Sequence, residues 1–382
     1  MYPILILKPQ REKSILQQHP WIFSGAVLTL PTAQTGDIIE IRDSKKAFLG
    51  FAFFDSDSQI IAKIFYFGKN PVTLDENFWL DKIKNAFELR QKYLHNQNTN
   101  AYRLLYAEGD FLPSIIADVY NEIVVVQLLS EGIEKIFPHI EKALYQLGFQ
   151  YIYLKNKNSQ KWLTQPYKEN IIWIKENNLE FCIDLEKSQK TGFFLDQREN
   201  RSLLQQYAKD KVVLNTFAYT GGFSVYALAG GASKVISADI SKEAIENCEK
   251  IINRNFPNTD KHSTYTGDCF DYLKNTEENF DIIVLDPPAF AKNKQAVKRA
   301  ARGYISLNEL AIRKIKKGGL IFTFSCSGHV DKDLFRKMVF AAAADVRRPV
   351  RVVHQLTQPL DHPINIYHPE GEYLKGLVLC VD

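Results

Sequence analysis

The pattern of hydrophobic and polar positions divides the chain into three stretches. Over residues 1–72, short apolar runs such as YPILIL, DIIEIR and IIAKIFYF are separated by turn residues. Runs of this length that are rich in β-branched and aromatic residues and bounded by turns are typical of strands. The first stretch is therefore predicted to be a small, mostly β domain.

Residues 73–180 combine two periodicities. Apolar residues recur at helical spacing over two segments, 76–94 and 133–148. Between and after them come strand-like runs over 114–120, 122–129, 151–156 and 170–175. A mixture of this kind predicts an α+β middle domain.

From residue 181 to residue 382 strands and helices alternate. Apolar strands such as KVVLNTF, KVISADI, DIIVLD and GGLIFTFS are separated by amphipathic segments such as KEAIENCEKIINRN. Near-continuous apolar strands between amphipathic helices are what a doubly wound parallel sheet requires. The sequence thus predicts a multidomain α/β protein with a Rossmann-like C-terminal domain.

Composition agrees with a folded chain of several domains. The 382 residues are 45% hydrophobic and 24% charged, and no apolar run reaches the roughly 18 residues that span a bilayer. We expect a cytoplasmic protein with no membrane partner. The five cysteines are scattered and never form a CxxC pair, which argues against disulfides and against a metal site.

The first strand-to-helix turn of the C-terminal domain, NTFAYTGGFS, is a candidate cofactor site. It contains Asn215, Tyr219, Gly221 and Gly222. In a doubly wound sheet the ligand binds at the carboxyl ends of the strands, and glycine lets the backbone approach it closely. Because the turn lacks the GxGxxG of a dinucleotide fold, a cofactor without phosphates is favoured. An ordinary glycine-bearing turn is the alternative.

Acidic residues end the following strands. Asp239 comes 17 positions after Gly222, near the interval at which an acid binds ribose hydroxyls. Asp268 ends the next strand and Asp286 the one after it. Asp268 could equally be a helix N-cap, but three acids on successive strand ends favour a binding site.

Two further motifs suggest a reacting site. Asp286 opens the tetrapeptide Asp-Pro-Pro-Ala, whose prolines stiffen a strand end, and Cys326 ends the next apolar strand. A thiolate that adds to carbon 6 of a pyrimidine makes carbon 5 nucleophilic toward a methyl donor. A buried filler is the alternative for Cys326, and His329 could either lower the pKa of its thiol or open the next helix.

A basic run lies between these two motifs. It contains Lys292, Lys294, Lys298, Arg299 and Arg302 without an acidic residue. Such a run is most often a solvated face, and with a nucleic acid as partner it would contact phosphates.

This combination resembles class I S-adenosylmethionine-dependent methyltransferases. The resemblance implies that Tyr219, Gly221 and Gly222 face the methionine moiety, that Asp239 binds ribose, and that Asp268 with Cys269 meets adenine. The upstream segment KTGFFLDQRENR matches a further motif of that family, with Phe194 over the cofactor and Asp196 and Arg198 holding the turn. Asn215, Asp286 and Pro287 complete the expected cofactor set. A capping box of Asp196 and Glu199 is the alternative for this segment.

The resemblance extends over nearly the whole chain. KSILQQHPWIFSGAV, AEGDFLPSIIADVY, DPPAFAKNK, FSCSG and PEGEYLKGLVL are similar to the RlmI family of 23S ribosomal RNA cytosine-5 methyltransferases. That family implies an RNA-binding PUA domain over residues 1–72, a linking α+β domain over 73–180 and a methyltransferase domain over 181–382. It places Cys326 at the nucleophile position, with Asp286 assisting. Its implied partner is the RNA of the large ribosomal subunit.

Two alternatives stay open. The protein could methylate a guanine or an exocyclic amine without thiol catalysis. It could also be an inactive RNA-binding protein of ribosome assembly. The oligomeric state is open as well, with a homodimer as one candidate.

Overall fold

The computed structural model describes residues 2–94, 98–156, 159–188, 190–291 and 293–382. Contacts between residues divide the chain into two compact units. The first consists of Met1–Ile174, Ile183–Leu195 and Leu360–Gly371, and the second of Lys175–Cys182, Asp196–Pro359 and Glu372–Asp382. Among the described residues, none of the helices combines the length and the apolar character that crossing a membrane requires.

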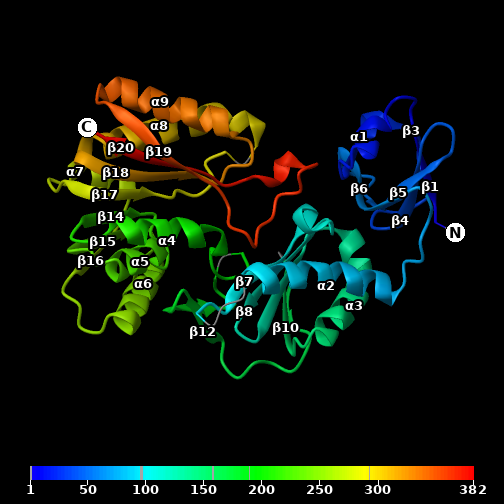
Figure 1. Cartoon of the computed structure of the whole chain (residues 1–382), viewed down its shortest axis with the longest axis horizontal. Helices are drawn as coiled ribbons and strands as arrows, with labels where there is room; N and C mark the ends of the chain where they lie inside the picture. Colours follow the sequence, from blue (N-terminus) through cyan, green and yellow to red (C-terminus); the bar gives the residue numbers. More distant parts are fainter. Residues whose placement is uncertain (1, 95–97, 157–158, 189, 292) are drawn as a thin grey trace. The chain divides into compact units, whose positions relative to one another are not determined.

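The first unit begins with a six-stranded sheet in the order β2-β6-β5-β4-β1-β3 (Figure 1). The short helix α1 (Lys13–Leu16) follows the first strand. The predicted mostly β fold of the N-terminal stretch is confirmed. The strands are β1 (Ile4–Leu7), β2 (Trp21–Phe23), β3 (Val27–Thr29), β4 (Ile38–Arg42), β5 (Phe48–Phe54) and β6 (Ile60–Phe67).

The first unit also contains a five-stranded sheet in the order β11-β10-β9-β8-β7. Helices α2 (Glu76–Tyr93) and α3 (Glu131–Gln146) pack against each other and against this sheet. Trp79 of α2 also packs on Phe65 of β6, with 5.1 Å between the ring centroids. The strands are β7 (Ala101–Tyr106), β8 (Ile115–Tyr120), β9 (Ile123–Leu128), β10 (Tyr151–Asn156) and β11 (Ser159–Trp162). The predicted α+β middle domain is confirmed.

The second unit is built on a seven-stranded sheet in the order β16-β15-β14-β17-β18-β20-β19. All pairings from β16 to β18 are parallel, and β20 runs antiparallel between β18 and β19. The predicted doubly wound, Rossmann-like sheet is thereby confirmed. The strands are β14 (Val212–Thr216), β15 (Lys234–Asp239), β16 (His262–Thr266), β17 (Phe280–Leu285), β18 (Ile315–Ser325), β19 (Val350–Leu356) and β20 (Lys375–Val381).

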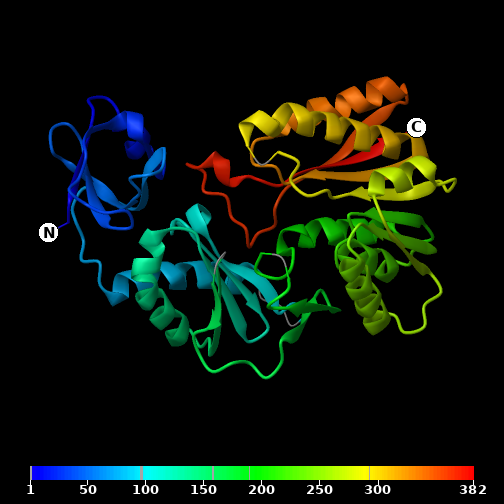
Figure 2. The ribbon, with the colours of Figure 1, turned by 180° about the vertical axis from the view of Figure 1, so that it is seen from behind.

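Helices cover both faces of this sheet, as Figures 1 and 2 show. On one face lie α4 (Arg198–Tyr207), α5 (Gly222–Ala229) and α6 (Lys242–Asn255). On the other lie α7 (Cys269–Asn275), α8 (Val297–Lys314) and α9 (Lys332–Val346). A separate two-stranded sheet of β12 (Ile171–Glu176) and β13 (Leu179–Asp184) precedes the α4 segment.

Candidate cofactor and reaction site

One edge of the seven-stranded sheet collects the motifs singled out in the sequence. Strands β16, β15, β14, β17 and β18 are parallel neighbours, so their carboxyl ends lie along the same edge. Gly221, Asp239, Asp268, Asp286 and Cys326 each stand in or directly beside the loop that follows one of these strands. The edge is therefore where a ligand of a doubly wound sheet would bind.

The loop after β14 has an unusual backbone. Phe217, Tyr219 and Gly221 all adopt the left-handed conformation, with φ of 53°, 48° and 79°. Such a conformation is unfavourable for residues other than glycine, so its surroundings must hold it in place. The Tyr219 amide donates to Asp239 Oδ2 at 2.9 Å, and the Phe217 amide donates to the Cys269 thiol at 3.2 Å. Burial raises the pKa of Cys269 to about 12, so this thiol is an inert support of the loop.

Glycine is required at position 221 for a second reason. A Cβ atom there would lie 2.3 Å from the Cys248 Sγ atom, closer than any real contact. Cys248 is buried in α6, and its Cβ atom would also lie 3.3 Å from the added atom. At Gly222 a Cβ atom would lie 3.1 Å from Arg201 Cδ, which is tight but involves a flexible side chain. The turn therefore packs its backbone directly against the neighbouring helix.

Asp239 is oriented by two backbone amides. Its Oδ2 atom accepts from Tyr219 and its Oδ1 atom accepts from Ser241, both at 2.9 Å. A carboxylate has about four lone-pair sites, so both oxygens can still accept from other donors. Binding of ribose hydroxyls by Asp239 stays a prediction.

Asp268 is the N-cap of α7. Its Oδ1 atom accepts from the amides of Phe270 at 2.7 Å and Asp271 at 3.1 Å. The capping interpretation left open in the sequence is confirmed, since the carboxylate satisfies amides at the start of the helix. Contact of Asp268 with adenine stays a prediction.

Asn215 lies inside the domain and is 1% exposed. Its amide group donates to Ser224 at 2.9 Å, and Ser224 in turn lies 2.6 Å from Ser237. The Ser237 hydroxyl is 2.9 Å from His262 Nε2. The side chain of Asn215 thus belongs to a buried polar network beneath the glycine turn.

Three further predicted residues lie just before α4 or at its first position. Phe194 belongs to the first compact unit, where Lys190 Nζ lies 5.0 Å from its ring centroid. Asp196 and Arg198 belong to the second unit. The carboxylate of Asp196 accepts a hydrogen bond from the Tyr373 hydroxyl. Arg198 Nε lies 3.4 Å from the buried carboxylate of Glu176. Their roles toward a cofactor stay predictions.

The capping box of Asp196 and Glu199 is wrong. Helix α4 begins at Arg198 with Gln197 as its N-cap, and the Gln197 side chain makes no capping hydrogen bond. The Asp196 carboxylate is instead used by Tyr373. Glu176 anchors the first turns of α4 through Arg201, which donates to it at 2.9 and 2.8 Å.

The two reacting motifs meet at the end of β17 and β18. Cys326 is partly exposed, and its thiol lies 3.9 Å from the carbonyl oxygen of Pro287. The backbone amide of Ala291 donates to Ser327 Oγ at 3.2 Å, which joins the two loops. Cys326 and the loop of Asp286 therefore share one site, as the strand order requires.

Two residues that the sequence did not indicate also support this site. Tyr304 of α8 lies 3.0 Å from the hydroxyl groups of both Ser325 and Ser327. Lys375, at the start of β20, donates to the carbonyl oxygen of Ser327 at 2.7 Å. A lysine inside the apolar run EYLKGLVLCVD was the available signal for Lys375. Nothing comparable marks Tyr304, because tyrosine is common in helices that pack on a sheet.

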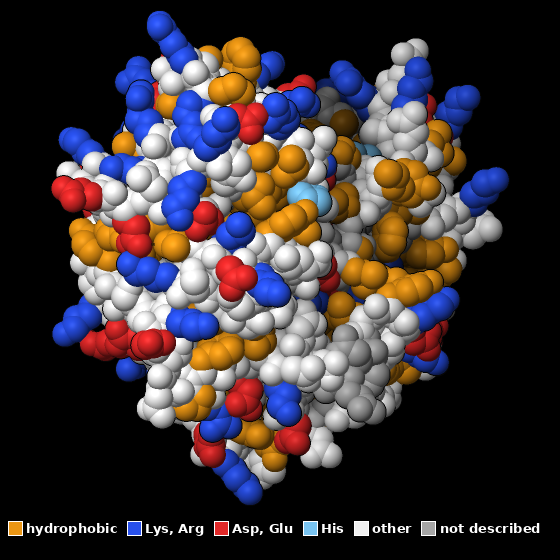
Figure 3. Space-filling model, turned by 60° about the vertical axis from the view of Figure 1, so that its left-hand side comes forward, with side chains coloured by type: hydrophobic (Ala, Val, Ile, Leu, Met, Phe, Trp, Pro, Cys, Tyr) orange, Lys and Arg blue, Asp and Glu red, His pale blue; other side chains and the backbone are white. Residues whose placement is uncertain are grey.

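Most of the predicted phosphate-contacting residues lie on the outside of α8 and just before it. Lys294, Lys298, Arg299 and Arg302 are exposed and form no ion pair with the described residues. Lys292 lies outside the described residues. On the face drawn in Figure 3, Lys and Arg side chains lie among Asp and Glu side chains. Contact of these residues with RNA stays a prediction.

The residues along this edge of the sheet fit S-adenosylmethionine. An oriented carboxylate at Asp239 suits ribose hydroxyls, and the close packing at Gly221 keeps the turn free of side-chain bulk. No lysine or arginine lies within the turn from 215 to 224, in keeping with a cofactor that carries no phosphate. No group of three or more metal-binding side chains occurs among the described parts of the chain.

Comparison with known proteins gives the class of the molecule. A family model described as S-adenosylmethionine-dependent methyltransferase matches residues 142–363, and one described as PUA-like domain matches residues 5–67. The crystal structure of SMU.776, a protein classed with the methyltransferases and complexed with SAH, superposes with a TM-score of 0.89 at 25% identity, covering 99% of this chain and 100% of that one. Fold and site thus define an S-adenosylmethionine-dependent methyltransferase, with S-adenosylmethionine as its cofactor.

Full-length relatives give the particular family. Ribosomal RNA large subunit methyltransferase I of Alteromonas mediterranea is 39% identical over 98% of both chains. The protein of the same name from Escherichia coli is 36% identical over 99% of both chains. The chain belongs to the ribosomal RNA large subunit methyltransferase I family, so the resemblance inferred from the sequence motifs is confirmed.

Proposed function

We propose that this enzyme methylates carbon 5 of a cytosine in the RNA of the large ribosomal subunit. The observation that carries the proposal is the partly exposed Cys326 thiol, 3.9 Å from the Pro287 carbonyl in the loop of Asp286. The relatives at 36 to 39% identity are named for large-subunit ribosomal RNA. A thiol at this position supplies the nucleophile that carbon 5 chemistry needs.

The reaction follows from the groups at the strand ends. The thiolate of Cys326 adds to carbon 6 of cytosine, and the electrons of the 5,6 double bond become available at carbon 5. S-adenosylmethionine supplies the methyl group that carbon 5 takes. Loss of the carbon 5 proton then restores the double bond as the carbon–sulfur bond breaks, which releases Cys326 as thiolate. Asp286, which follows β17, would stabilise the developing charge when it is protonated or paired to the ring nitrogen and amino group.

The same proposal assigns the cofactor set. Asp239 would bind the ribose hydroxyls, and the turn containing Tyr219, Gly221 and Gly222 would face the methionine moiety. Asp268 and Cys269 would border the adenine. Asn215, Phe194, Asp196, Arg198 and Pro287 complete the set predicted from the sequence, as positions that shape or close the site.

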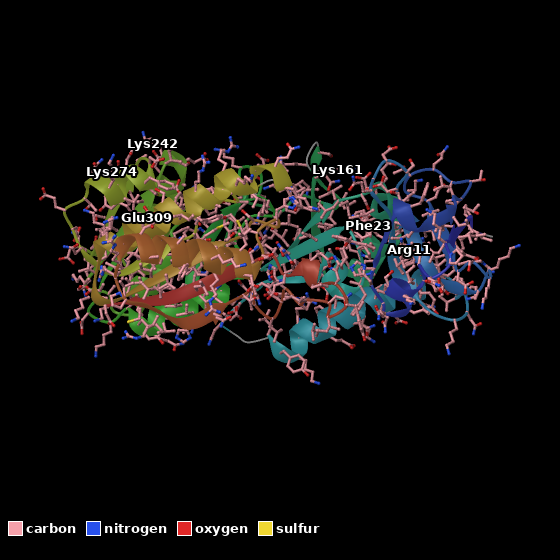
Figure 4. All side chains as sticks on the ribbon, turned by 90° about the horizontal axis from the view of Figure 1, so that it is seen from above. Arg11, Phe23, Lys161, Lys242, Lys274 and Glu309 are labelled. Atoms are coloured by element: carbon pink, nitrogen blue, oxygen red, sulfur yellow. The ribbon has the colours of Figure 1, made fainter. Side chains whose placement is uncertain are left out.

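RNA would be bound by more than one surface. In the N-terminal sheet a pocket of about 270 Å³ is lined by Arg11, Trp21 and Phe23 among others, and Phe23 is 49% exposed. Arg11 and Phe23 are labelled in Figure 4. An exposed ring beside a guanidinium group suits stacking on an unpaired base. The exposed cations of α8 would contact phosphates near the reacting site. A substrate of this kind places the enzyme in the cytoplasm.

The domain assignment forms part of the proposal. Residues 1–72 would form the RNA-binding domain and residues 181–382 the methyltransferase domain. Residues 73–180 would form an α+β domain that links these two. The family match to residues 5–67 as a PUA-like domain supports the first of these assignments.

Trapping with a modified RNA tests the mechanism. Large-subunit ribosomal RNA transcribed with 5-fluorocytidine should form a stable adduct with the enzyme in the presence of S-adenosylmethionine. Fluorine replaces the hydrogen at carbon 5, so there is no proton whose loss would release the cysteine. Peptide mass mapping should find the adduct on Cys326. The Cys326→Ser variant should form none while binding the cofactor normally in calorimetry. Cys380→Ser is the matched control, since Cys380 is also a partly exposed thiol, and it should form the adduct.

Two results would contradict the proposal. Methylation of a guanine or an exocyclic amine without an adduct would establish the reaction without thiol catalysis. Absence of cofactor binding by the native protein would establish an inactive RNA-binding protein.

A further inference from the structure

Lys375 is a buried cation next to the proposed nucleophile. It lies opposite Ser325 in the antiparallel pairing of β20 with β18, and it is 4% exposed. Its ammonium group donates to the carbonyl oxygens of Ser327 at 2.7 Å and Tyr373 at 2.6 Å. Both acceptors are neutral. The positive charge is therefore brought against the loop of Cys326 without a bonded carboxylate among the described residues.

Burying an ammonium group in this way is costly, so the surroundings should favour its charge. Burial lowers the pKa of Lys375 to about 8, whereas the charge of Cys326 raises it, followed by the charges of Glu372 and Asp331. Both carboxylates also have other partners. Glu372 forms an ion pair with Lys332 at 2.5 Å, and Asp331 accepts from the Leu334 amide at 2.7 Å as the N-cap of α9. Among the nearby negative charges, that of Cys326 thus stabilises the charged form of Lys375 most.

A cation beside the Cys326 thiol favours its ionisation. The Cys326 thiol lies 3.9 Å from the Pro287 carbonyl oxygen, an acceptor that favours the protonated thiol. Tyr304 holds the hydroxyl groups of Ser325 and Ser327 on both sides of it, and the pKa of Tyr304 is raised by burial. Asp286, in the neighbouring loop, bears a negative charge when ionised. The Pro287 carbonyl oxygen and an ionised Asp286 favour the protonated thiol, whereas the charge of Lys375 favours the thiolate.

We propose that the Lys375 ammonium group stabilises the thiolate of Cys326 and so prepares it for attack on carbon 6 of the pyrimidine. This inference rests on the proposed function. The thiol proton leaves to water on the exposed side of Cys326. Lys375 acts as a positioning residue through Cys326, with two of its N–H groups fixed by backbone carbonyls and its charge acting on the sulfur.

The effect of Lys375 on the Cys326 thiolate depends on pH. With a pKa of about 8, Lys375 is largely protonated at pH 7 and loses its charge as the pH rises above about 8. The stabilising effect on the thiolate is therefore greatest near neutrality. A thiol without this help ionises near pH 8.5, and an adjacent lysine lowers that value.

The ionisation of Cys326 can be measured without RNA. We would alkylate the full-length protein with iodoacetamide between pH 5 and pH 10 and follow the Cys326 peptide by mass spectrometry. In the native protein the inflection should lie below pH 8.5. In K375Q, which keeps amide donors but lacks the charge, and in K375M, alkylation at pH 7 should fall by about tenfold. K375R keeps the charge and should remain close to the native profile.

Controls separate this idea from a structural role and from the proposed function. Lys242→Met removes an exposed lysine of α6 and should leave the profile unchanged. Calorimetry with S-adenosylmethionine shows that each variant is folded. A native inflection at or above pH 8.5, or an unchanged profile in K375Q, would overturn the role of Lys375. A displaced profile without an adduct on 5-fluorocytidine RNA would support Lys375 and refute Cys326 as the nucleophile.

Discussion

The hydroxyl group of Tyr304 lies 3.0 Å from the Ser327 Oγ atom. The same hydroxyl accepts from Ser325 Oγ at 3.0 Å, so one side chain of α8 holds both neighbours of Cys326. The Tyr304 ring also packs on Phe290 of the loop after β17, with 4.8 Å between centroids. The two loops of the reacting site are thus fixed to each other through a buried tyrosine.

Tyr304→Phe should weaken both stability and catalysis. The change leaves two buried serine hydroxyls without this partner, which should lower the free energy of unfolding by about 1 to 3 kcal/mol. Because the loop of Cys326 loses its support, kcat should fall while cofactor affinity is kept. Urea unfolding, methylation rates and calorimetry measure the three quantities. Tyr207→Phe, at a surface tyrosine bonded to His354, should change the unfolding free energy by less than about 0.5 kcal/mol. Equal effects of the two substitutions would contradict this role.

Gly221→Ala should destabilise the cofactor turn through a steric clash. The new Cβ atom would lie 2.3 Å from Cys248 Sγ. We expect loss of measurable S-adenosylmethionine binding in calorimetry and a lower unfolding free energy, by about 2 kcal/mol or more.

Gly318→Ala is the matched control for this substitution. Gly318 has φ of +77°, close to the +79° of Gly221, but no atom lies within 4 Å of its hypothetical Cβ atom. It therefore carries the backbone cost of about 1 kcal/mol without the clash. If Gly318→Ala destabilises as much as Gly221→Ala, backbone conformation rather than packing against Cys248 explains the requirement for glycine.

The exposed cations of α8 should contribute to RNA affinity in a salt-dependent way. Replacing Lys298 and Arg302 by alanine removes two charges one helical turn apart, which should weaken RNA binding and reduce the slope of log K against log salt by about 1 to 2. Filter binding at several salt concentrations measures this slope. The double variant at Lys242 and Lys274, both exposed and labelled in Figure 4, removes the same charge from α6 and α7. If the control loses as much RNA affinity, the effect comes from the net charge of the protein, and α8 is not an RNA-binding surface.

The strand ends could be predicted from the sequence because a parallel sheet has a simple rule. Apolar runs that stop at Asp239, Asp286 and Cys326 must stop on one edge if the strands are parallel neighbours. Helix α8 was not predicted, because its first turns were interpreted only as a basic run. Its buried residues nevertheless recur at helical spacing, namely Ala300, Tyr304, Leu307 and Ala311.

What the sequence could not indicate are contacts between distant residues. The Lys375 ammonium group donates to the carbonyl oxygen of Ser327, 48 positions away, as well as to that of Tyr373, and it reaches Ser327 because β20 pairs with β18. The hydrogen bond from Tyr373 to the Asp196 carboxylate is another such contact, between residues 177 positions apart. Local sequence patterns therefore predict which residues lie at the edge of the sheet. They do not predict which of these side chains form hydrogen bonds with distant residues.

His262 should make the stability of the second unit depend on pH. Burial lowers the pKa of His262 to about 4 from 6.5, because the partly buried ring loses the water that would solvate its charged form. The ring also lies 2.9 Å from the Ser237 hydroxyl, in the network beneath the glycine turn. Between these values the unfolded chain binds more protons, so the free energy of unfolding rises with pH and this contribution is complete above about pH 6.5. From pH 7 to pH 4.5 the native protein should lose about 2 to 3 kcal/mol from this group. His262→Gln should lose less over that range, measured by urea unfolding at both pH values, whereas His329→Gln, at an exposed histidine, should behave as the native protein does. An equal loss in His262→Gln and the native protein would show that other groups govern the acid sensitivity.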